Sequence, residues 1–316
     1  MKALLCAIVL IGLPAYAQDQ ADDAEAQNTQ AAAAEAQNTT TPQNPAQPQR
    51  AERSALNVTP GTEAIQNKDL YESTGIIHPF RRMARFVAKD EERIWTSPFH
   101  TSKSDLKYWL IFGAATGTLI AFDEKIQKAA PNPNALVTLG TNGSYLGAAY
   151  TLIPISAGFY FIGSKTKNER FREAGLLSFE TLINTTLVEE ALKIVTDRQR
   201  PLEGTGEGQF FHSTNRLNSG FPSGHSINTF GLASVFAHEY SHTTWVKVVA
   251  YSYAAGVALA RLAADRHFPS DTLAGGAMGW FIGDYVYAKR HNPSLDQKRT
   301  VTQKILDHVR IGGAAY

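Results

Sequence analysis

Residues 246–271, VKVVAYSYAAGVALARLAADRHFPSD, combine the two features that decide how the chain folds and where its chemistry lies. The first part, Val246–Ala263, is apolar and does not alternate between apolar and polar side chains, so it favours a helix over a strand. Arg261, His267 and Asp271 lie at and just beyond its end. The stretch therefore predicts an apolar helix with reactive side chains at its carboxyl end.

Five further segments have similar length and composition, and no part of the chain sustains the period-two alternation of a half-buried strand. They are Leu106–Phe122, Tyr145–Gly163, Ala174–Val195, Ser226–Glu239 and Thr272–Ala288. Together the six predict an all-α protein, a helical bundle of about six core helices. Small residues within them predict close helix approach. The small-residue runs are Gly113-Ala114-Ala115, Gly147-Ala148-Ala149, Ala254-Ala255-Gly256 and Gly275-Gly276-Ala277.

The charge and cysteine content exclude several classes of protein. Thirty Lys and Arg residues against 29 Asp and Glu give a formal net charge of +1, so the chain lacks the basic excess of nucleic-acid-binding proteins. The only cysteine, Cys6, excludes an internal disulfide and a zinc site built from cysteines. We therefore expect no nucleic-acid partner, and no feature of the sequence indicates a protein partner.

The chain divides into five regions by composition. Lys2, an apolar run and Ala15-Tyr16-Ala17 predict a signal peptide over residues 1–17, whose cleavage removes Cys6. Residues 18–66, rich in Ala, Gln, Asn and Thr at their start, predict a disordered low-complexity spacer. Residues 67–104 predict an amphipathic helical extension, residues 105–291 the catalytic helical domain, and residues 292–316 a carboxyl-terminal tail.

The extension carries basic and apolar residues together, which allows two interpretations. It either lies on a membrane surface or packs its apolar face on the bundle and leaves its basic face in solvent. The second interpretation is favoured because Asp90, Glu91 and Glu92 dilute the positive charge.

Membrane topology poses a conflict. The mean hydropathy of -0.22 is lowered by the polar residues 18–50, so it does not exclude spans. A secretory signal places residues 18–104 outside, so six membrane spans would put the carboxyl end of the third segment in the cytoplasm. The basic tail Lys289-Arg290 instead suits a cytoplasmic position, which requires the carboxyl end of the third segment to face outside. We expect a periplasmic domain, soluble or membrane-associated, with a multi-pass inner-membrane protein as the alternative.

Three clusters of chemically active residues lie at the ends of helical segments. The first is Lys193 with Arg200-Pro201, the second is Pro222-Ser223-Gly224-His225, and the third is Arg261, His267 and Asp271. Each alone has an ordinary explanation, such as a helix-surface ion pair or a turn. Together they predict a site for a phosphate group.

The residue types match what phosphoryl transfer requires. Three cations, Lys193, Arg200 and Arg261, suit a doubly charged tetrahedral oxyanion. Ser223 offers a hydroxyl and an N–H, and Gly224 allows close backbone approach at the start of a helix, where free amides bind anions. One histidine can attack phosphorus while a second protonates the leaving oxygen, and Asp271 can hold a tautomer. Carboxylates and histidines for a dinuclear metal centre are absent from the motifs, so we expect no metal and no cofactor in the reaction.

This arrangement resembles the type 2 phosphatidic acid phosphatases, which share a helical fold with class A acid phosphatases and vanadium haloperoxidases. The family pattern of Lys-x6-Arg-Pro, Pro-Ser-Gly-His and Ser-Arg-x5-His-x3-Asp fits every interval here. One departure is Ala260, where the family has Ser, which removes a hydroxyl beside Arg261.

The resemblance implies a role for each residue. His267 is the nucleophile, Asp271 orients it, and His225 protonates the leaving group and then activates water. The implied phosphate ligands are Lys193, Arg200, Ser223, Gly224 and Arg261.

The predicted function is a metal-independent phosphatase for phosphomonoesters, in particular lipid phosphates of the phosphatidate or isoprenyl pyrophosphate type, acting through a phosphohistidine. The alternatives are a vanadium-dependent haloperoxidase, because vanadate mimics phosphate, and a non-catalytic lipid-phosphate-binding protein. The expected partners are a phosphorylated lipid or small phosphomonoester and a membrane surface or interior. In the loop Leu202–Phe221, Phe210 and Phe211 either meet the substrate chain or anchor the loop.

Overall fold

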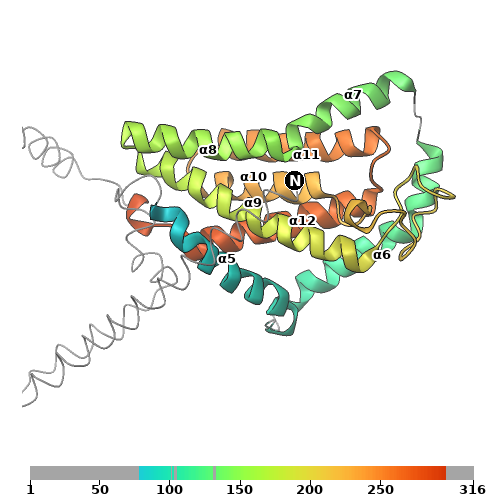
Figure 1. Cartoon of the computed structure of the whole chain (residues 1–316), viewed down its shortest axis with the longest axis horizontal. Coiled ribbons are helices and arrows are strands. Elements are labelled where there is room, and N and C mark those ends of the chain that lie inside the picture. Colours follow the sequence, from blue (N-terminus) through green and yellow to red (C-terminus); the bar gives the residue numbers. More distant parts are fainter. Residues whose placement is uncertain (1–77, 101, 103–104, 131–132, 297–316) are drawn as a thin grey trace, which may run out of the picture.

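The computed structural model describes residues 78–100, 102, 105–130 and 133–296, and within them the regular structure is helical (Figure 1). The α-helices are α5 His78–Thr96, α6 Leu106–Ala129, α7 Asn134–Ser144, α8 Ala149–Thr166, α9 Glu169–Thr196, α10 Gly224–Glu239, α11 Thr244–Ala263 and α12 Pro269–Arg290. Short 3-10 turns are η2 Ser97–His100, η3 Tyr145–Gly147, η4 Arg216–Asn218 and η5 Pro293–Leu295. The predicted all-α class is confirmed. The predicted signal peptide, the spacer and most of the tail lie outside the described residues.

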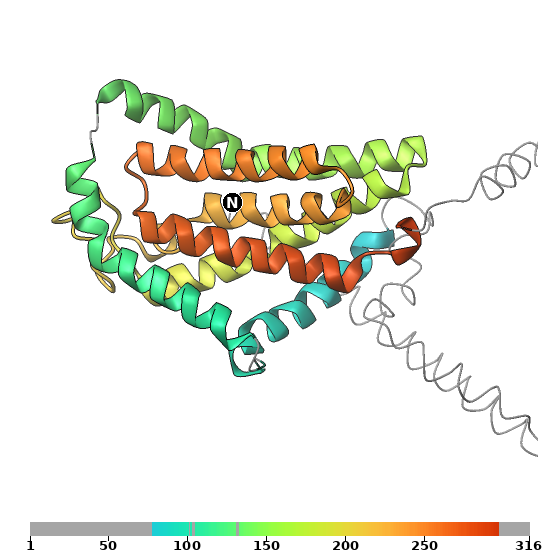
Figure 2. The same cartoon turned by 180° about the vertical axis from the view of Figure 1, so that it is seen from behind.

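Helix α10 lies at the centre of the bundle. It packs against α9, α11 and α12, while α8 covers α9 and α6 lies along α12 (Figures 1 and 2). All six predicted helices are present, most of them longer than expected at one or both ends. Aliphatic side chains fill the space between α9, α10 and α12, and the fully buried ones include Leu177, Ile227 and Val286.

Glycines bring α12 against α10. A Cβ at Gly275 would lie 2.6 Å from the carbonyl oxygen of Ser223, and a Cβ at Gly279 or Gly283 would overlap the backbone of α10. The predicted close approach is therefore confirmed for Gly275. It is wrong for Gly113 and Gly256, which face open space and are exposed.

Helix α7 is not among the predicted segments. Its sequence, NALVTLGTNGS, is short and rich in Gly, Asn and Thr, which are weak helix formers. It packs on α11 through Gly140, where a Cβ would lie 2.7 to 2.8 Å from backbone atoms of residues 260–264. Tertiary contact therefore stabilises a helix that local preference disfavours.

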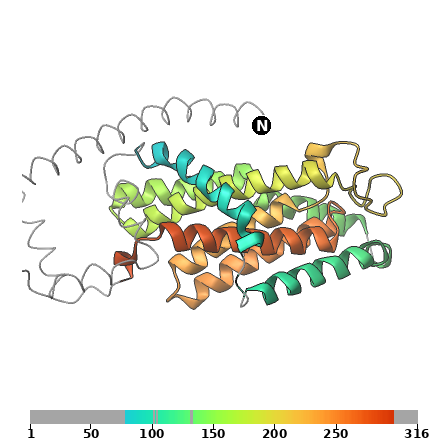
Figure 3. The same cartoon turned by 90° about the horizontal axis from the view of Figure 1, so that it is seen from below.

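Helix α5 crosses the bundle diagonally and packs on α9 through buried Met83, Phe86 and Val87 (Figure 3). Asp90 is not a surface charge that dilutes the basic face, although its sequence context predicts one. It is 1% exposed and accepts a hydrogen bond of 2.8 Å from Arg290. Arg290 is likewise buried rather than a solvated charge of the basic tail. An ion pair between α5 and the end of α12 thus fixes the extension to the bundle.

Two stretches are long and apolar enough to cross a membrane, Asn134–Thr166 and Thr244–Ala263. Only 28% and 17% of their most apolar windows are buried inside the structure. Large apolar side chains on α11 therefore face outward, among them Trp245, Val248, Val249 and Leu259.

Candidate active site

The three motifs meet at one end of the bundle, because α9 and α11 end where α10 and α12 begin (Figure 1). Lys193 lies in the last turn of α9, His225 in the first turn of α10, and Arg261 in the last turn of α11. His267 precedes α12 and Asp271 lies in its first turn. The structure brings the predicted residues together, and their roles stay predictions.

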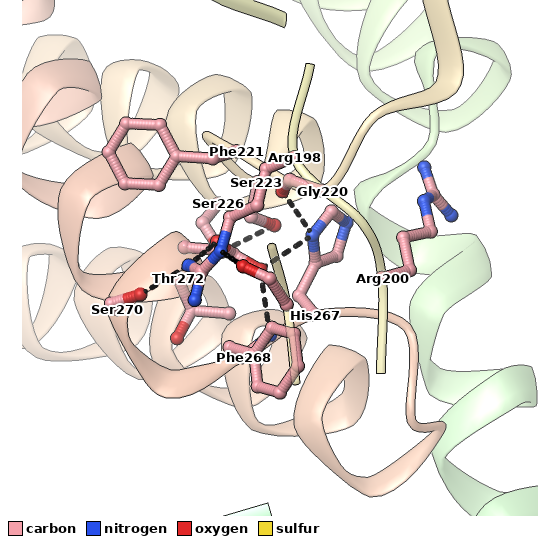
Figure 4. Close-up of polar contacts among 12 residues, drawn as sticks. Arg198, Arg200, Gly220, Phe221, Ser223, Ser226, His267, Phe268, Ser270 and Thr272 are labelled. Atoms are coloured by element: carbon pink, nitrogen blue, oxygen red, sulfur yellow. Dashed lines mark hydrogen bonds and ion pairs between the residues drawn. The ribbon is translucent and has the colours of Figure 1, made fainter. Parts of the chain in front are cut away.

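His267 is 1% exposed, and its Nδ1 lies 2.8 Å from the carbonyl oxygen of Gly220 (Figure 4). A carbonyl accepts hydrogen bonds only, so Nδ1 carries the proton and Nε2 keeps its lone pair. Burial, followed by the nearby charges of Arg261 and Arg200, holds the pKa of His267 well below its usual value. The ring is therefore a neutral imidazole whose Nε2 lone pair is available.

Asp271 was predicted to hold the tautomer of His267, but it does not accept a hydrogen bond from that ring. Its Oδ2 lies 3.6 Å from Nδ1 of His267, which exceeds hydrogen-bond length, and accepts instead from the backbone N–H of Phe268 at 2.8 Å. The contact fixes the start of α12. Gly220 thus sets the tautomer, while the Asp271 carboxylate acts on the ring through its charge.

Arg198, which lies between Lys193 and Arg200 of the first motif, holds Asp271 in place. Its guanidinium is 1% exposed and donates to Asp271 Oδ1 at 2.5 Å, to Asp123 Oδ2 at 2.7 Å and to Ser270 Oγ at 2.7 Å (Figure 4). Burial raises the pKa of Asp271 to about 6, and Arg198 opposes that rise. The network also joins α6, through Asp123, to the site. Sequence offers no signal for this link, because Asp123 is 75 residues away.

The three predicted phosphate-binding cations differ in their partners. Lys193 is buried and forms an ion pair with Glu189 of the same helix, while Arg200 donates to the backbone and side-chain oxygens of Asn218, both at 2.8 Å. Nε of Arg261 is buried and has no hydrogen-bond acceptor among the described residues. An unsatisfied buried guanidinium donor is costly unless an anion binds to it.

The turn before α10 differs from the expectation in two details. The N–H of Ser223 donates to the backbone oxygen of Asp271 at 3.0 Å and is not available to an anion. A Cβ at Gly224 would overlap the carboxylate of Glu189, so the glycine makes room for that side chain. No side chain caps α10, and the amides of residues 224–226 in its first turn remain the anion donors.

His225 lies beside the same cations. Burial, followed by the charge of Arg261, lowers its pKa to about 3. A bound phosphate dianion would offset the positive charge of these side chains and raise the pKa of His225.

In the loop between Pro201 and Phe221, the structure shows different surroundings for Phe210 and Phe211, which the sequence could not distinguish. The Phe210 ring lies over the Arg198 guanidinium at 4.8 Å and contacts the Phe221 ring edge-on, whereas Phe211 is 70% exposed. Phe210 thus anchors the loop. Phe211 is the side chain free to meet a substrate chain.

Comparison with known proteins agrees with the predicted resemblance. Residues 174–294 match the PAP2 superfamily. A lipid A 1-phosphatase of Porphyromonas gingivalis is 37% identical over 68 residues, which cover 21% of this chain and 15% of that protein. The chain thus matches only a small part of this curated relative's length.

Two solved structures are also similar. The first transmembrane PAP2 type phosphatidylglycerolphosphate phosphatase from Bacillus subtilis has 26% identity and a TM-score of 0.46, over 62% of this chain and 96% of that one. Aquifex aeolicus LpxE has 22% identity and a TM-score of 0.36, over 52% and 92%.

Proposed function

From the PAP2 superfamily match over residues 174–294, which contains all three motifs, we propose that this protein is a metal-independent phosphatase of lipid phosphomonoesters. The single observation that carries the proposal is that three cations and two histidines meet at one end of the bundle. Among them, the buried Nε of Arg261 has no hydrogen-bond acceptor in the described residues. A phosphate group satisfies that donor and the free amides of α10 together.

In the first step Nε2 of His267 attacks phosphorus and a P–N bond forms. The ester P–O bond breaks, and His225 in its acid form transfers a proton to the departing alkoxide. Gly220 accepts the Nδ1–H throughout, while Asp271 stabilises the positive charge that develops on the ring. Lys193, Arg200 and Arg261 hold the equatorial oxygens.

In the second step His225, now neutral, takes a proton from water as the water attacks phosphorus. The P–N bond breaks, phosphate leaves and His267 regains its lone pair. No step needs a metal ion, so we expect phosphate release to persist in EDTA.

We propose further that the enzyme is membrane-associated and acts on the periplasmic side of the inner membrane. The outward apolar side chains of α11 and α8 support contact with lipid. The curated relative is named as a lipid A 1-phosphatase, which supports a phosphorylated lipid as the substrate.

The first test replaces the nucleophile. His267→Ala is expected to abolish phosphate release, because it removes the imidazole that forms the P–N bond, while the helical content is unchanged. His238→Ala is the control, since His238 pairs with Asp284 at 3.1 Å toward the other end of α10. Near-normal turnover by His267→Ala would overturn the mechanism.

The substrate is identified by phosphate release from phosphatidate, phosphatidylglycerol phosphate, an isoprenyl pyrophosphate and a soluble phosphomonoester, on separated soluble and membrane fractions. We expect the lipids to be preferred in the membrane fraction. Equal rates with the soluble ester would contradict a lipid phosphatase but leave the phosphohistidine mechanism intact.

A further inference from the structure

A second cluster of buried ionisable residues lies at the opposite end of the bundle from the active site. It joins Glu173 in the first turns of α9, Glu239 at the end of α10 and His291 directly after α12. All three are buried, and one ligand atom from each lies within 4.8 Å of the others. The length of α10, 16 residues, separates it from the active site by about 24 Å.

The cluster has more acceptors than donors. Glu239 is 0% exposed, yet neither of its carboxylate oxygens has a hydrogen-bond partner, and Oε2 of Glu173 also has none. The nearest cationic atoms to Glu239 are Nδ1 of His291 at 3.5 Å and a guanidinium nitrogen of Arg170 at 3.7 Å. A buried carboxylate that accepts no hydrogen bond is costly, and a bound cation would stabilise it.

The histidine is oriented as in metal sites. Its Nδ1 faces the two glutamates, at 2.7 Å from Glu173 Oε1, while Nε2 lies 2.8 Å from Oδ2 of Asp296. A metal-bound histidine commonly donates its other ring N–H to a carboxylate, which fixes the tautomer. Asp296 is in turn held by Arg170 at 2.9 Å.

We propose that Glu173, Glu239 and His291 bind a divalent transition-metal ion with the ligand preference of Zn²⁺. Carboxylate oxygens and imidazole nitrogens are both Zn²⁺ ligands, and a water molecule can take the fourth position. Two ligand atoms of a tetrahedral Zn²⁺ site are about 3.3 Å apart. Here Nδ1 of His291 lies 2.7 Å from Oε1 of Glu173 and 3.5 Å from Oε2 of Glu239. The ion neutralises both glutamates, and Arg170 neutralises Asp296.

The site is structural, because its ligands tie together the ends of three helices and the chain that follows α12. It does not depend on the proposed phosphatase activity. The reaction at the other end still needs no metal, so chelation lowers thermal stability without stopping turnover at low temperature.

The test uses the full chain purified without a histidine tag and stripped with EDTA. Zinc at a free concentration about 100-fold above the Kd of the site is expected to raise the Tm by about 5 to 10 °C. Elemental analysis should find about one zinc per chain. Glu239→Gln is expected to lose both the zinc and the shift. Asp284→Asn, which removes another carboxylate paired with a histidine near this end, keeps them.

The Tm of stripped Glu239→Gln shows whether this variant folds, and Glu173→Gln provides a second ligand variant. The alternative is a protonated His291 bridging the two glutamates without metal. A wild-type Tm that is indifferent to zinc, or a zinc shift that survives in both glutamine variants, overturns the metal site.

Discussion

His267 is controlled by two neighbours with separate effects. Gly220 accepts its Nδ1–H and leaves Nε2 free, while Asp271 contributes charge from 3.6 Å. Arg198 fixes Asp271 from the far side. The tautomer of His267 and the charge that supports its ring therefore come from different residues.

The state of Asp271 predicts an acid limb in the pH profile. Its pKa is raised from 3.8 to about 6, so the supporting carboxylate is present above pH 6 and is lost as the pH falls through 6. We expect kcat to decline below about pH 6. Asp271→Asn is expected to lower kcat by about 10² to 10⁴-fold and to lose this limb. A phosphomonoester also titrates near pH 6, so a limb of equal size in Asp271→Asn would assign it to the substrate.

Arg198 is expected to be a major contributor to stability. Arg198→Met leaves the carboxylates of Asp123 and Asp271 buried without their cation, so the free energy of unfolding should fall by about 3 to 5 kcal/mol. Arg216→Met is the control, because the Arg216 side chain is 70% exposed and its pair with Asp197 is worth less than about 1 kcal/mol. Denaturant unfolding measures both, and similar losses would contradict this role.

At the scale of elements, the contact between α10 and α12 positions the site. The Ser223 turn and the start of α12 are joined backbone to backbone, and glycines along α12 let the two axes approach. His225 and Asp271 therefore keep a fixed relation as long as this contact is intact.

The glycine contact makes a matched pair of substitutions informative. Gly279→Ala places a Cβ against the backbone of Ile227 and should destabilise the protein by about 1 to 3 kcal/mol. Gly256→Ala on α11 meets nothing within 4 Å and should stabilise it by about 0.5 to 1 kcal/mol. Thermal unfolding tests the difference, and equal effects would mean that α10 and α12 are further apart than described.

At the scale of the whole molecule, the described residues combine a buried ionic interior with an apolar exterior. Buried ion pairs join α5 and α9 to α12, and Arg198 pairs with both α6 and α12. In contrast, α11 and α8 expose large apolar side chains. Such a surface favours lipid contact over water.

This surface predicts membrane fractionation. We expect the protein to stay with membranes after a wash at about 1 M salt, where screening limits charge attraction to a range of about 3 Å. Detergent should be required for extraction. Recovery of most of the protein in the wash would contradict apolar contact and support a surface held by charge.

Much of the fold was predictable, because apolar segments of helical length mark each core helix whatever its neighbours. Helix α7 was missed because its local preference is weak and contact with α11 stabilises it. Among the small residues, sequence could not distinguish Gly275, which lies against α10, from Gly256, which faces open space. That difference depends on which face of a helix meets a neighbour.

The helical class, the three motifs and the chemistry that their residue types allow were predictable, because they depend on composition and on spacing along the chain. The packing of the helices was needed to show that Gly220 sets the tautomer of His267 and that Arg198 and Asp123 support Asp271. It was also needed to show that Glu173, Glu239 and His291 meet at the far end. Those partners are distant in sequence, and side chains so separated become neighbours only when helices pack.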